Sequence, residues 1–293
     1  MLLLLDFLLY LIFTLFFQSI ITPTPLSDTG NVRYRTIPVM TLLLILANSL
    51  IFMIFQAPNL YQGTRLYAEG DPQGALMLND YIQQVWTFGF RGAFMRDGLS
   101  IGAFSAFTSM FMHSDMWHLI GNMIYLWTFG RRVEDACGSW RFLIFYLLAG
   151  MVAGIGSEIF NTTHVDIPSI GASGAIAGVM GAYLVLFPSS MVVCFWGIGI
   201  ILRLPIVVIL RLVGVSWVQD APTWRWTIKL PGFVLLVFFL SREFLSSLFT
   251  FLQQDDIGGV NHAAHLTGFL AALFIFLYVR KDLLTRYFSG RRL

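Results

Sequence analysis

Residues 171–178 read GASGAIAG and place one hydroxyl group, that of Ser173, among small residues in a strongly apolar chain. Two other apolar stretches carry polar side chains: HSDMWHLIGNM holds His118 and Asn122, and AHLTGFLAA holds His265. A serine that hydrogen-bonds a histidine can pass its proton to that histidine and attack a carbonyl carbon, which is the minimum for nucleophilic catalysis. These residue types therefore indicate acyl transfer, with Ser173 as nucleophile and His265 as base and then acid.

The local surroundings of Ser173 favour the same chemistry. Pro168 and Gly171 mark the end of a loop, so Ser173 is expected in the first turn of a helix, where amide N–H groups lack intrahelical partners. Those amides and the positive end of the helix dipole stabilise a developing oxyanion. His118 and Asn122 are four residues apart and therefore lie on one helix face. We expect an oxyanion site made by His118, Asn122, Gly171 and the Ser173 amide.

The elements that position these residues are expected to be membrane helices. The chain is 57% hydrophobic and only 12% charged, with a mean hydropathy of +0.75. So few charges cannot cover a soluble globule of this length, and the alternating pattern of an outer-membrane barrel is absent. Two cysteines, Cys137 and Cys194, are too few for a disulfide framework and are interpreted as structural. The composition predicts an all-α integral membrane protein.

Seven stretches are long and apolar enough to be predicted as membrane spans. They are residues 2–21, 38–56, 114–130, 141–160, 170–187, 232–252 and 262–279. Lys and Arg concentrate in alternate connections and after the last span, so the positive-inside rule predicts a cytoplasmic C-terminus, in an inner or plasma membrane. The connection 57–113 has mixed charge and is expected on the outer side.

Small residues predict which spans meet. Gly174 and Gly178 are four residues apart in the fifth span, and Gly268 and Ala272 follow His265 at three and seven residues in the last. Such strips let two helix backbones approach closely in a membrane. A close crossing would bring Ser173 and His265 within reach of each other.

The chain is divided by these features into several parts. Residues 1–23 lack a basic start and a cleavage pattern, so they predict an extra N-terminal transmembrane helix, followed by a cytoplasmic linker at 24–35. Within the core at 36–282, the stretch 190–230 carries Arg203, Pro205 and Arg211, which are costly at the bilayer centre. We interpret it as an interfacial or re-entrant cytoplasmic insertion, with a hairpin of two short spans as the alternative. Residues 283–293 form a basic cytoplasmic tail.

Four segments, taken together, resemble a known family. HSDMWHLIGNM, GRRVEDACGSWRF, GASGAIAGVMGAY and AHLTGFLAA resemble the signature segments of rhomboid intramembrane serine proteases, over roughly residues 36–282. The resemblance implies a six-helix rhomboid-like bundle, here with one extra N-terminal helix, and a Ser173–His265 dyad without a carboxylate. It also implies hydrolysis of peptide bonds in or near transmembrane helices of other proteins.

The resemblance assigns supporting roles as well. It places His118 and Asn122 at the oxyanion, and it implies that Glu134 ties the loop after the second core helix to its neighbours. His113 either lines the cavity and supports His118 or is a solvated interface histidine. The Trp-Arg pair expected before His113 has no clear counterpart, because Trp86 and Arg91 are five residues apart.

Other functions are open at this stage. A catalytically silent relative would bind membrane-protein clients through the same fold, but it would be expected to lack the serine or the histidine. A solute transporter would show inverted repeats, which the sequence lacks. A zinc protease is disfavoured because HExxH is absent. We therefore expect no metal or cofactor, transmembrane protein substrates and membrane lipid as partners, and no nucleic acid.

Overall fold

The structure is a computed structural model of the chain, and it describes residues 23–28, 36–93, 99–158, 167–196, 205, 208–214, 227–253 and 260–279. The chain divides into two compact units. The smaller unit comprises residues 1–31 and 189–235, and the larger one comprises residues 32–188 and 236–293. The predicted helix at 2–21 and the basic tail at 283–293 lie outside the described residues.

The smaller unit contains a three-stranded antiparallel sheet in the order β1-β2-β3. Its strands are β1 (Thr24–Asp28), β2 (Met191–Phe195) and β3 (Thr227–Pro231). Val192 and Cys194 on β2 are fully buried, which fits the alternation of a strand with one packed face. Burial raises the pKa of the Cys194 thiol to about 12, so this cysteine is an inert core residue, as its structural interpretation expects.

This sheet is built from two segments in which the sequence analysis predicts no strand. Residues 24–35 are predicted as a cytoplasmic linker, and the first of them form β1. Residues 190–230 are predicted as an interfacial or re-entrant insertion, and the two ends of this stretch form β2 and β3. Pairing between Thr24 and Phe195 joins segments far apart in the chain, and such pairing leaves no trace in local periodicity. The fold as a whole is still that of a mainly helical membrane protein.

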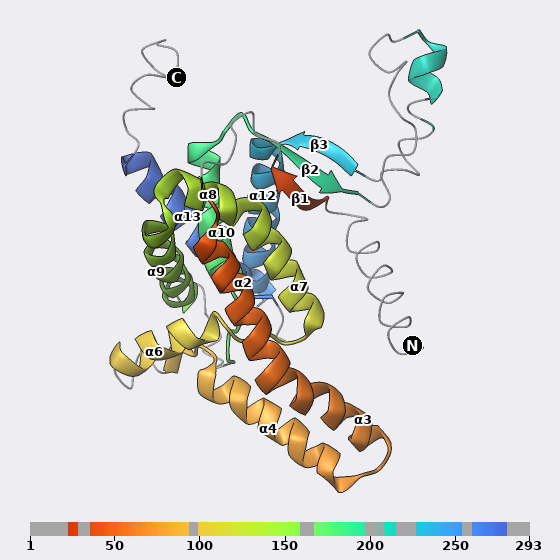
Figure 1. Cartoon of the computed structure of the whole chain (residues 1–293), viewed down its shortest axis with the longest axis vertical. Coiled ribbons are helices and arrows are strands. Elements are labelled where there is room, and N and C mark those ends of the chain that lie inside the picture. The colour runs from red at the N-terminus through yellow and green to blue at the C-terminus, as the bar shows by residue number, and fades with distance from the viewer. Residues whose placement is uncertain are drawn as a thin grey trace. The chain divides into compact units, whose positions relative to one another are not determined.

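The larger unit begins with one long continuous helix, Val39–Ala68. It consists of α2 (Val39–Ile51), two π-helical turns, η1 (Phe52–Gln56) and η2 (Pro58–Gln62), and α3 (Gly63–Ala68). Gly70 has φ 79° and reverses the chain, and Asp71 then caps α4 (Pro72–Phe88) by accepting a hydrogen bond from the Gln73 amide. Figure 1 shows α3 and α4 side by side as a helical hairpin. The connection 57–113 is thus largely helical.

Most of the remaining helices follow the predicted spans closely: α7 (Met116–Tyr125) with η3 (Leu126–Gly130), α9 (Ser139–Ser157), α10 (Ser173–Leu186), α12 (Gly232–Gln253) and α13 (His262–Val279). Two further helices, α6 (Leu99–Ser109) and α8 (Arg131–Cys137), lie in the predicted connections. Four described helices are long and apolar enough to cross a membrane: Val39–Ala68, Ser139–Ser157, Gly232–Phe249 and His262–Val279. The predicted multi-pass helical membrane protein is confirmed.

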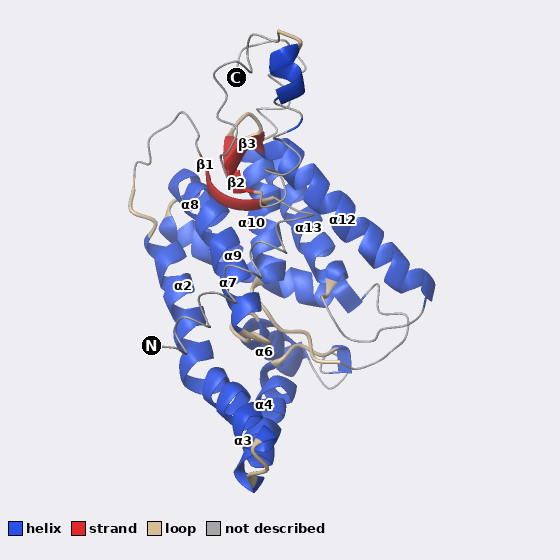
Figure 2. Ribbon diagram, turned by 90° about the vertical axis from the view of Figure 1, so that its right-hand side faces the viewer, coloured by secondary structure: helices blue, strands red, loops and turns tan. Residues whose placement is uncertain are grey.

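Helices α9, α10 and α13 contact one another and form the centre of the larger unit (Figure 2). A β-carbon built on Gly174 would lie 2.7 Å from the Ala153 β-carbon, and one built on Gly178 would lie 2.7 Å from the Ala149 β-carbon. A β-carbon on Gly268 would meet the carbonyl oxygen of Gly174. The helices approach this closely because small residues line all three of them.

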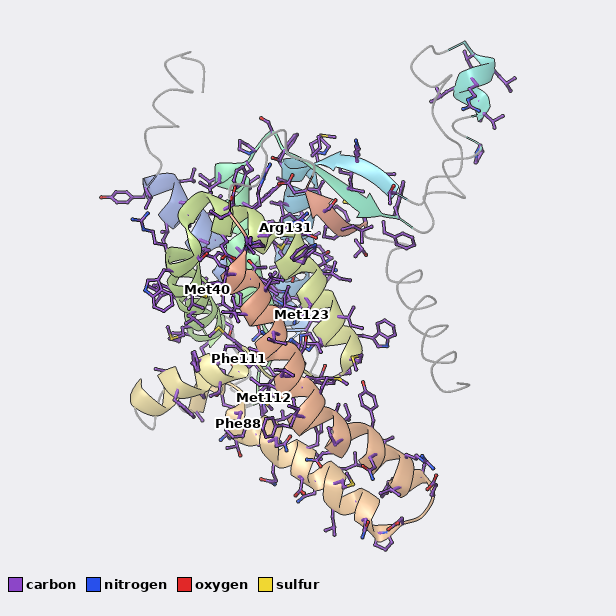
Figure 3. All side chains as sticks on the ribbon, in the orientation of Figure 1. Met40, Phe88, Phe111, Met112, Met123 and Arg131 are labelled. Carbon is purple, nitrogen blue, oxygen red and sulfur yellow. The ribbon has the colours of Figure 1, made fainter. Side chains whose placement is uncertain are left out.

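One end of the larger unit is held together by a buried carboxylate. Figure 3 shows Met40 and Arg131 toward one end and Phe88, Phe111 and Met112 toward the other. At the Met40 end, the fully buried Glu134 carboxylate accepts hydrogen bonds from the Met40 and Thr41 amides, at 2.9 and 2.8 Å, and from the Thr41 hydroxyl at 2.7 Å. Glu134 therefore caps the start of α2 and joins α8 to it.

Candidate active site

Ser173 is the first residue of α10, and the loop before it is held by backbone pairing. Phe90 and Ser169 exchange two hydrogen bonds, at 2.9 and 2.8 Å. Gly171 has φ 123°, a conformation that L-residues rarely adopt. No side chain caps the first turn of α10, so its leading amides point toward the site without a side-chain acceptor. Ser173 itself is partly exposed, as a nucleophile must be.

Gly171 differs from the role expected for it in the oxyanion site. Its amide donates to the Ser109 carbonyl at 2.9 Å, so that N–H is not free to bind an oxyanion. A β-carbon at Gly171 would lie 2.6 Å from His118 Nε2 and 3.6 Å from Ser173 Oγ. Gly171 therefore leaves open a space that both His118 Nε2 and the Ser173 hydroxyl border.

His118 lies in the first turn of α7, and its surroundings fix its tautomer. Asp115 caps this helix by accepting from the amides of Trp117 and His118, at 2.7 and 3.0 Å. The Ser114 amide donates to His118 Nδ1 at 3.4 Å. Because an amide N–H only donates, Nδ1 of the neutral ring is the acceptor and Nε2 carries the proton. His118 thus presents a donor N–H at the space beside Gly171, which is the form that an oxyanion site requires.

Asn122 lies one turn after His118 and is buried together with His113. Its Nδ2 lies 3.0 Å from His113 Nε2. An amide nitrogen has two hydrogens, so one donor of Asn122 is left for a ligand. The His113 and His118 rings are 5.0 Å apart, nearly perpendicular. His113 therefore supports the site by positioning Asn122 and by packing against His118.

His113 is held in place by the fully buried Gln56 of η1. The Gln56 side chain donates to the His113 carbonyl at 2.9 Å and accepts from the His113 amide at 3.0 Å. Burial and the neighbouring His118 lower the pKa of His113 to about 3. His113 is therefore neutral and fully enclosed, and not a solvated interface histidine.

His265 lies in the first turn of α13, which Asn261 begins. The Asn261 side chain accepts from the Ala264 amide at 2.9 Å, and its Nδ2 donates to the Ser169 hydroxyl at 3.1 Å. Asn261 therefore links the start of α13 to the loop before Ser173. Helices α10 and α13 meet at Gly174 and Ala264, which are the sequence neighbours of Ser173 and His265. A β-carbon at Gly174 would lie 3.9 Å from that of Ala264.

The structure places Ser173, His118 and His265 in the first turns of three helices, α10, α7 and α13, with Asn122 one turn further along α7. Ser173 and His118 both border the space at Gly171, and α10 and α13 meet at Gly174 and Ala264. His265 is buried, with 8% of its surface exposed. A hydroxyl, a helix start, N–H donors and an imidazole are the groups that acyl transfer uses.

Glu243 of α12 is a residue that the sequence reasoning did not single out. Its carboxylate is fully buried, and Oε2 lies 2.9 Å from His265 Nδ1 and 2.6 Å from His262 Nδ1. The resemblance implied a dyad without a carboxylate, so this contact is a departure from it. The signal in the sequence was an ionisable Arg242–Glu243 pair inside an apolar span, a feature that marks function by default.

The same three side chains are a possible metal-ligand set. One ligand atom each from Glu243, His262 and His265 lies within 4.8 Å of the others. Two histidines and one carboxylate are the donors of many catalytic zinc sites. The distances from Oε2 to the two ring nitrogens are also those of ordinary hydrogen bonds. Hydrogen bonds from the two rings to Oε2 are therefore sufficient to hold the trio together.

The segment before α6 contains a cation–π contact. The Arg91 guanidinium lies over the Trp86 ring, 5.1 Å from its centroid. The two residues are five apart in the sequence, so they are not the Trp-Arg pair that the resemblance implies. A cation over a tryptophan face stabilises the turn between them.

Comparison with known proteins identifies the family. A family model described as "Rhomboid domain" matches residues 102–282, which include every proposed catalytic and oxyanion residue. The chain belongs to the rhomboid family. This confirms the resemblance seen in the four motifs.

Several curated rhomboid proteins are similar to parts of the chain. "Rhomboid protein 1, mitochondrial" of Saccharomyces cerevisiae is 29% identical over 117 residues, covering 39% of this chain and 34% of its own length. "Rhomboid protease GluP" of Bacillus subtilis is 44% identical over 77 residues, covering 26% and 14%. "RHOMBOID-like protein 6, mitochondrial" of Arabidopsis thaliana is 29% identical over 157 residues, covering 50% of each. The chain thus spans half or less of these relatives.

Proposed function

We propose that this rhomboid is an intramembrane serine protease that hydrolyses peptide bonds in or near transmembrane helices of other membrane proteins. The observation that carries the proposal is the space at Gly171, which both His118 Nε2 and Ser173 Oγ border, at the start of a helix, α10, that packs against the helix of the buried His265. One relative is named a protease, which agrees with it.

The proposed reaction follows the usual course of acyl transfer. Ser173 Oγ attacks the scissile carbonyl carbon while His265 Nε2 takes the hydroxyl proton. The carbonyl oxygen becomes an oxyanion, stabilised by the Ser173 amide, His118 Nε2–H and Asn122 Nδ2–H. The imidazolium returns the proton to the leaving amine. Water then attacks the acyl-serine, with His265 again as base, and releases the carboxylic acid and free Ser173.

The membrane and its topology complete the proposal. Several relatives are named mitochondrial and others are bacterial, so the kind of membrane is not fixed by kinship. The basic connections favour an inner or plasma membrane with the C-terminus in the cytoplasm. In that orientation the Ser173 site opens toward the outer side, where water enters it.

The test is labelling of the detergent-solubilised protein with a fluorophosphonate serine probe. Wild type is expected to be labelled, and Ser173→Ala and His265→Ala are expected to lose the label while keeping the wild-type melting temperature. A generic transmembrane substrate should be cut by wild type alone. If a folded wild type neither reacts with the probe nor cuts the substrate, the silent client-binding relative becomes the better interpretation.

A further inference from the structure

Glu243 is a buried carboxylate within an apolar helix, where an unpaired charge would be strongly unfavourable. It belongs to Gly232–Phe249, a helix apolar enough to span a membrane, and its side chain is fully buried. A buried charge is costly unless it is paired and hydrogen-bonded, and an ionisable group in a membrane helix marks function by default. Arg242, the adjacent residue, donates from Nε to Glu243 Oε1 at 3.1 Å and supplies the compensating positive charge.

The other oxygen of Glu243 is shared by two histidines of α13. Oε2 lies 2.9 Å from His265 Nδ1 and 2.6 Å from His262 Nδ1. An ionised carboxylate only accepts hydrogen bonds, so each of these Nδ1 atoms carries a proton. In the neutral ring of His265, Nε2 then holds the free lone pair. This is the tautomer in which Nε2 acts as a base.

We propose that Glu243 is a positioning residue of the catalytic site, which holds His265 in the Nδ1–H tautomer and stabilises the imidazolium formed when His265 accepts the Ser173 proton. The inference rests on the proposed protease function. In the proton transfer, the Ser173 O–H bond breaks, the His265 Nε2–H bond forms, and the Nδ1 proton stays on the ring. Glu243 exchanges no atom and remains ionised throughout.

The geometry favours this role over a purely structural one. Packing α12 against α13 does not require a charge, and apolar side chains of similar volume often replace a buried ion pair without loss of stability. Phe239 of α12 already packs on α13, with its ring 6.2 Å from that of His265 and 6.3 Å from that of Phe269. The carboxylate adds what these rings cannot, which is an anionic acceptor at His265 Nδ1.

The kinetic test compares Glu243→Gln and Glu243→Asp with Ser241→Ala. Ser241 lies on the same helix, where its hydroxyl only donates to the Val237 carbonyl. Fluorophosphonate labelling is followed over probe concentration, in the presence of a chelator, to separate the maximal rate kinact from the half-saturating concentration KI. For Glu243→Gln we expect kinact to fall by about 10²–10⁴-fold, as for other triad carboxylates, with KI little changed. Glu243→Asp should recover part of the rate, and Ser241→Ala should behave as wild type.

A second readout reports the tautomer directly and does not depend on activity. Long-range ¹⁵N–¹H spectra of the ¹⁵N-histidine-labelled protein distinguish Nδ1–H from Nε2–H, and the signals that disappear in His265→Gln identify His265. Wild type should show His265 as the Nδ1–H tautomer, and this population should fall in Glu243→Gln.

These outcomes separate the two proposals. An unreactive wild type with the Nδ1–H tautomer would reject the protease function and retain the Glu243–His265 contact. A reactive wild type whose folded Glu243→Gln variant keeps kinact within about threefold would overturn the positioning role, since removal of a triad carboxylate costs far more. If Glu243→Gln does not fold, Glu243→Asp and the wild-type tautomer decide: a wild type with the Nε2–H tautomer would also overturn it.

Discussion

The contact between α9, α10 and α13 gives a sharp prediction, because it depends on one missing methyl group. A β-carbon built on Gly178 would lie 2.7 Å from the Ala149 β-carbon, 3.3 Å from the Gly268 carbonyl oxygen and 3.7 Å from the Ala272 β-carbon. Carbon atoms pack best at about 3.5–4.0 Å. In Gly178→Ala the helices must therefore separate by roughly 1 Å, since a β-carbon cannot rotate away.

The energetic cost can be isolated with a matched variant. Overpacking of this kind costs about 1–3 kcal/mol, while alanine in place of a helical glycine contributes about 1 kcal/mol of stability. Gly121 of α7 has no atom within 4 Å of a built β-carbon. Gly121→Ala should therefore gain the helix stability of alanine without the cost of overpacking. Gly178→Ala should be less stable than Gly121→Ala by about 1–3 kcal/mol in thermal unfolding of the solubilised protein.

The same displacement should reduce reactivity. Ser173 lies on α10, which Gly178→Ala pushes away from α9, while the new β-carbon also comes within 3.3 Å of the Gly268 carbonyl oxygen on α13, the helix of His265. A misplacement of about 1 Å can lower a catalysed rate by about 10²-fold. Fluorophosphonate labelling of Ser173 measures this loss. Ala149→Gly in the Gly178→Ala background removes the closest contact and should restore much of the rate and stability. Equal melting temperatures and labelling rates for Gly178→Ala and Gly121→Ala would show that the helices are not packed as described.

Two further predictions concern the buried polar groups. The pKa of His113 is lowered to about 3 from an ordinary 6.5, so its stabilising contribution is present above pH 6.5 and is lost as the pH falls toward 3. The free energy of unfolding should therefore drop by about 2 kcal/mol between pH 7 and 5. In chemical denaturation, His113→Gln should flatten this dependence on pH. Glu134→Gln weakens the three hydrogen bonds to Met40 and Thr41 and should cost about 1–3 kcal/mol, seen as a lower melting temperature; an unchanged one would show that the α2 cap contributes little.

The catalytic candidates could be found in the sequence because each one is a local exception. Ser173, His118, Asn122 and His265 are polar side chains in apolar, small-residue stretches, and desolvation makes such exceptions costly without a role. The helix that follows Ser173 and the small residues that let α10 approach α13 are also local patterns. Helical spans were predictable for the same reason, since apolar length fixes them.

Other features depend on contacts between distant residues, and only the tertiary structure decided them. Glu243 and His265 are 22 residues apart on different helices, and no periodicity pairs a carboxylate on one helix with a ring on another. The Gly171 amide is not free, because it donates a hydrogen bond to the carbonyl of Ser109, a distant residue in the sequence. The strand pairing of Thr24 with Phe195 likewise joins residues on either side of the segment that runs from α2 to α10. The sequence by itself determined which groups are candidates for the chemistry, because side-chain type and local spacing carry that information. The tertiary structure decided their tautomers and partners, because hydrogen bonds between elements are set by packing.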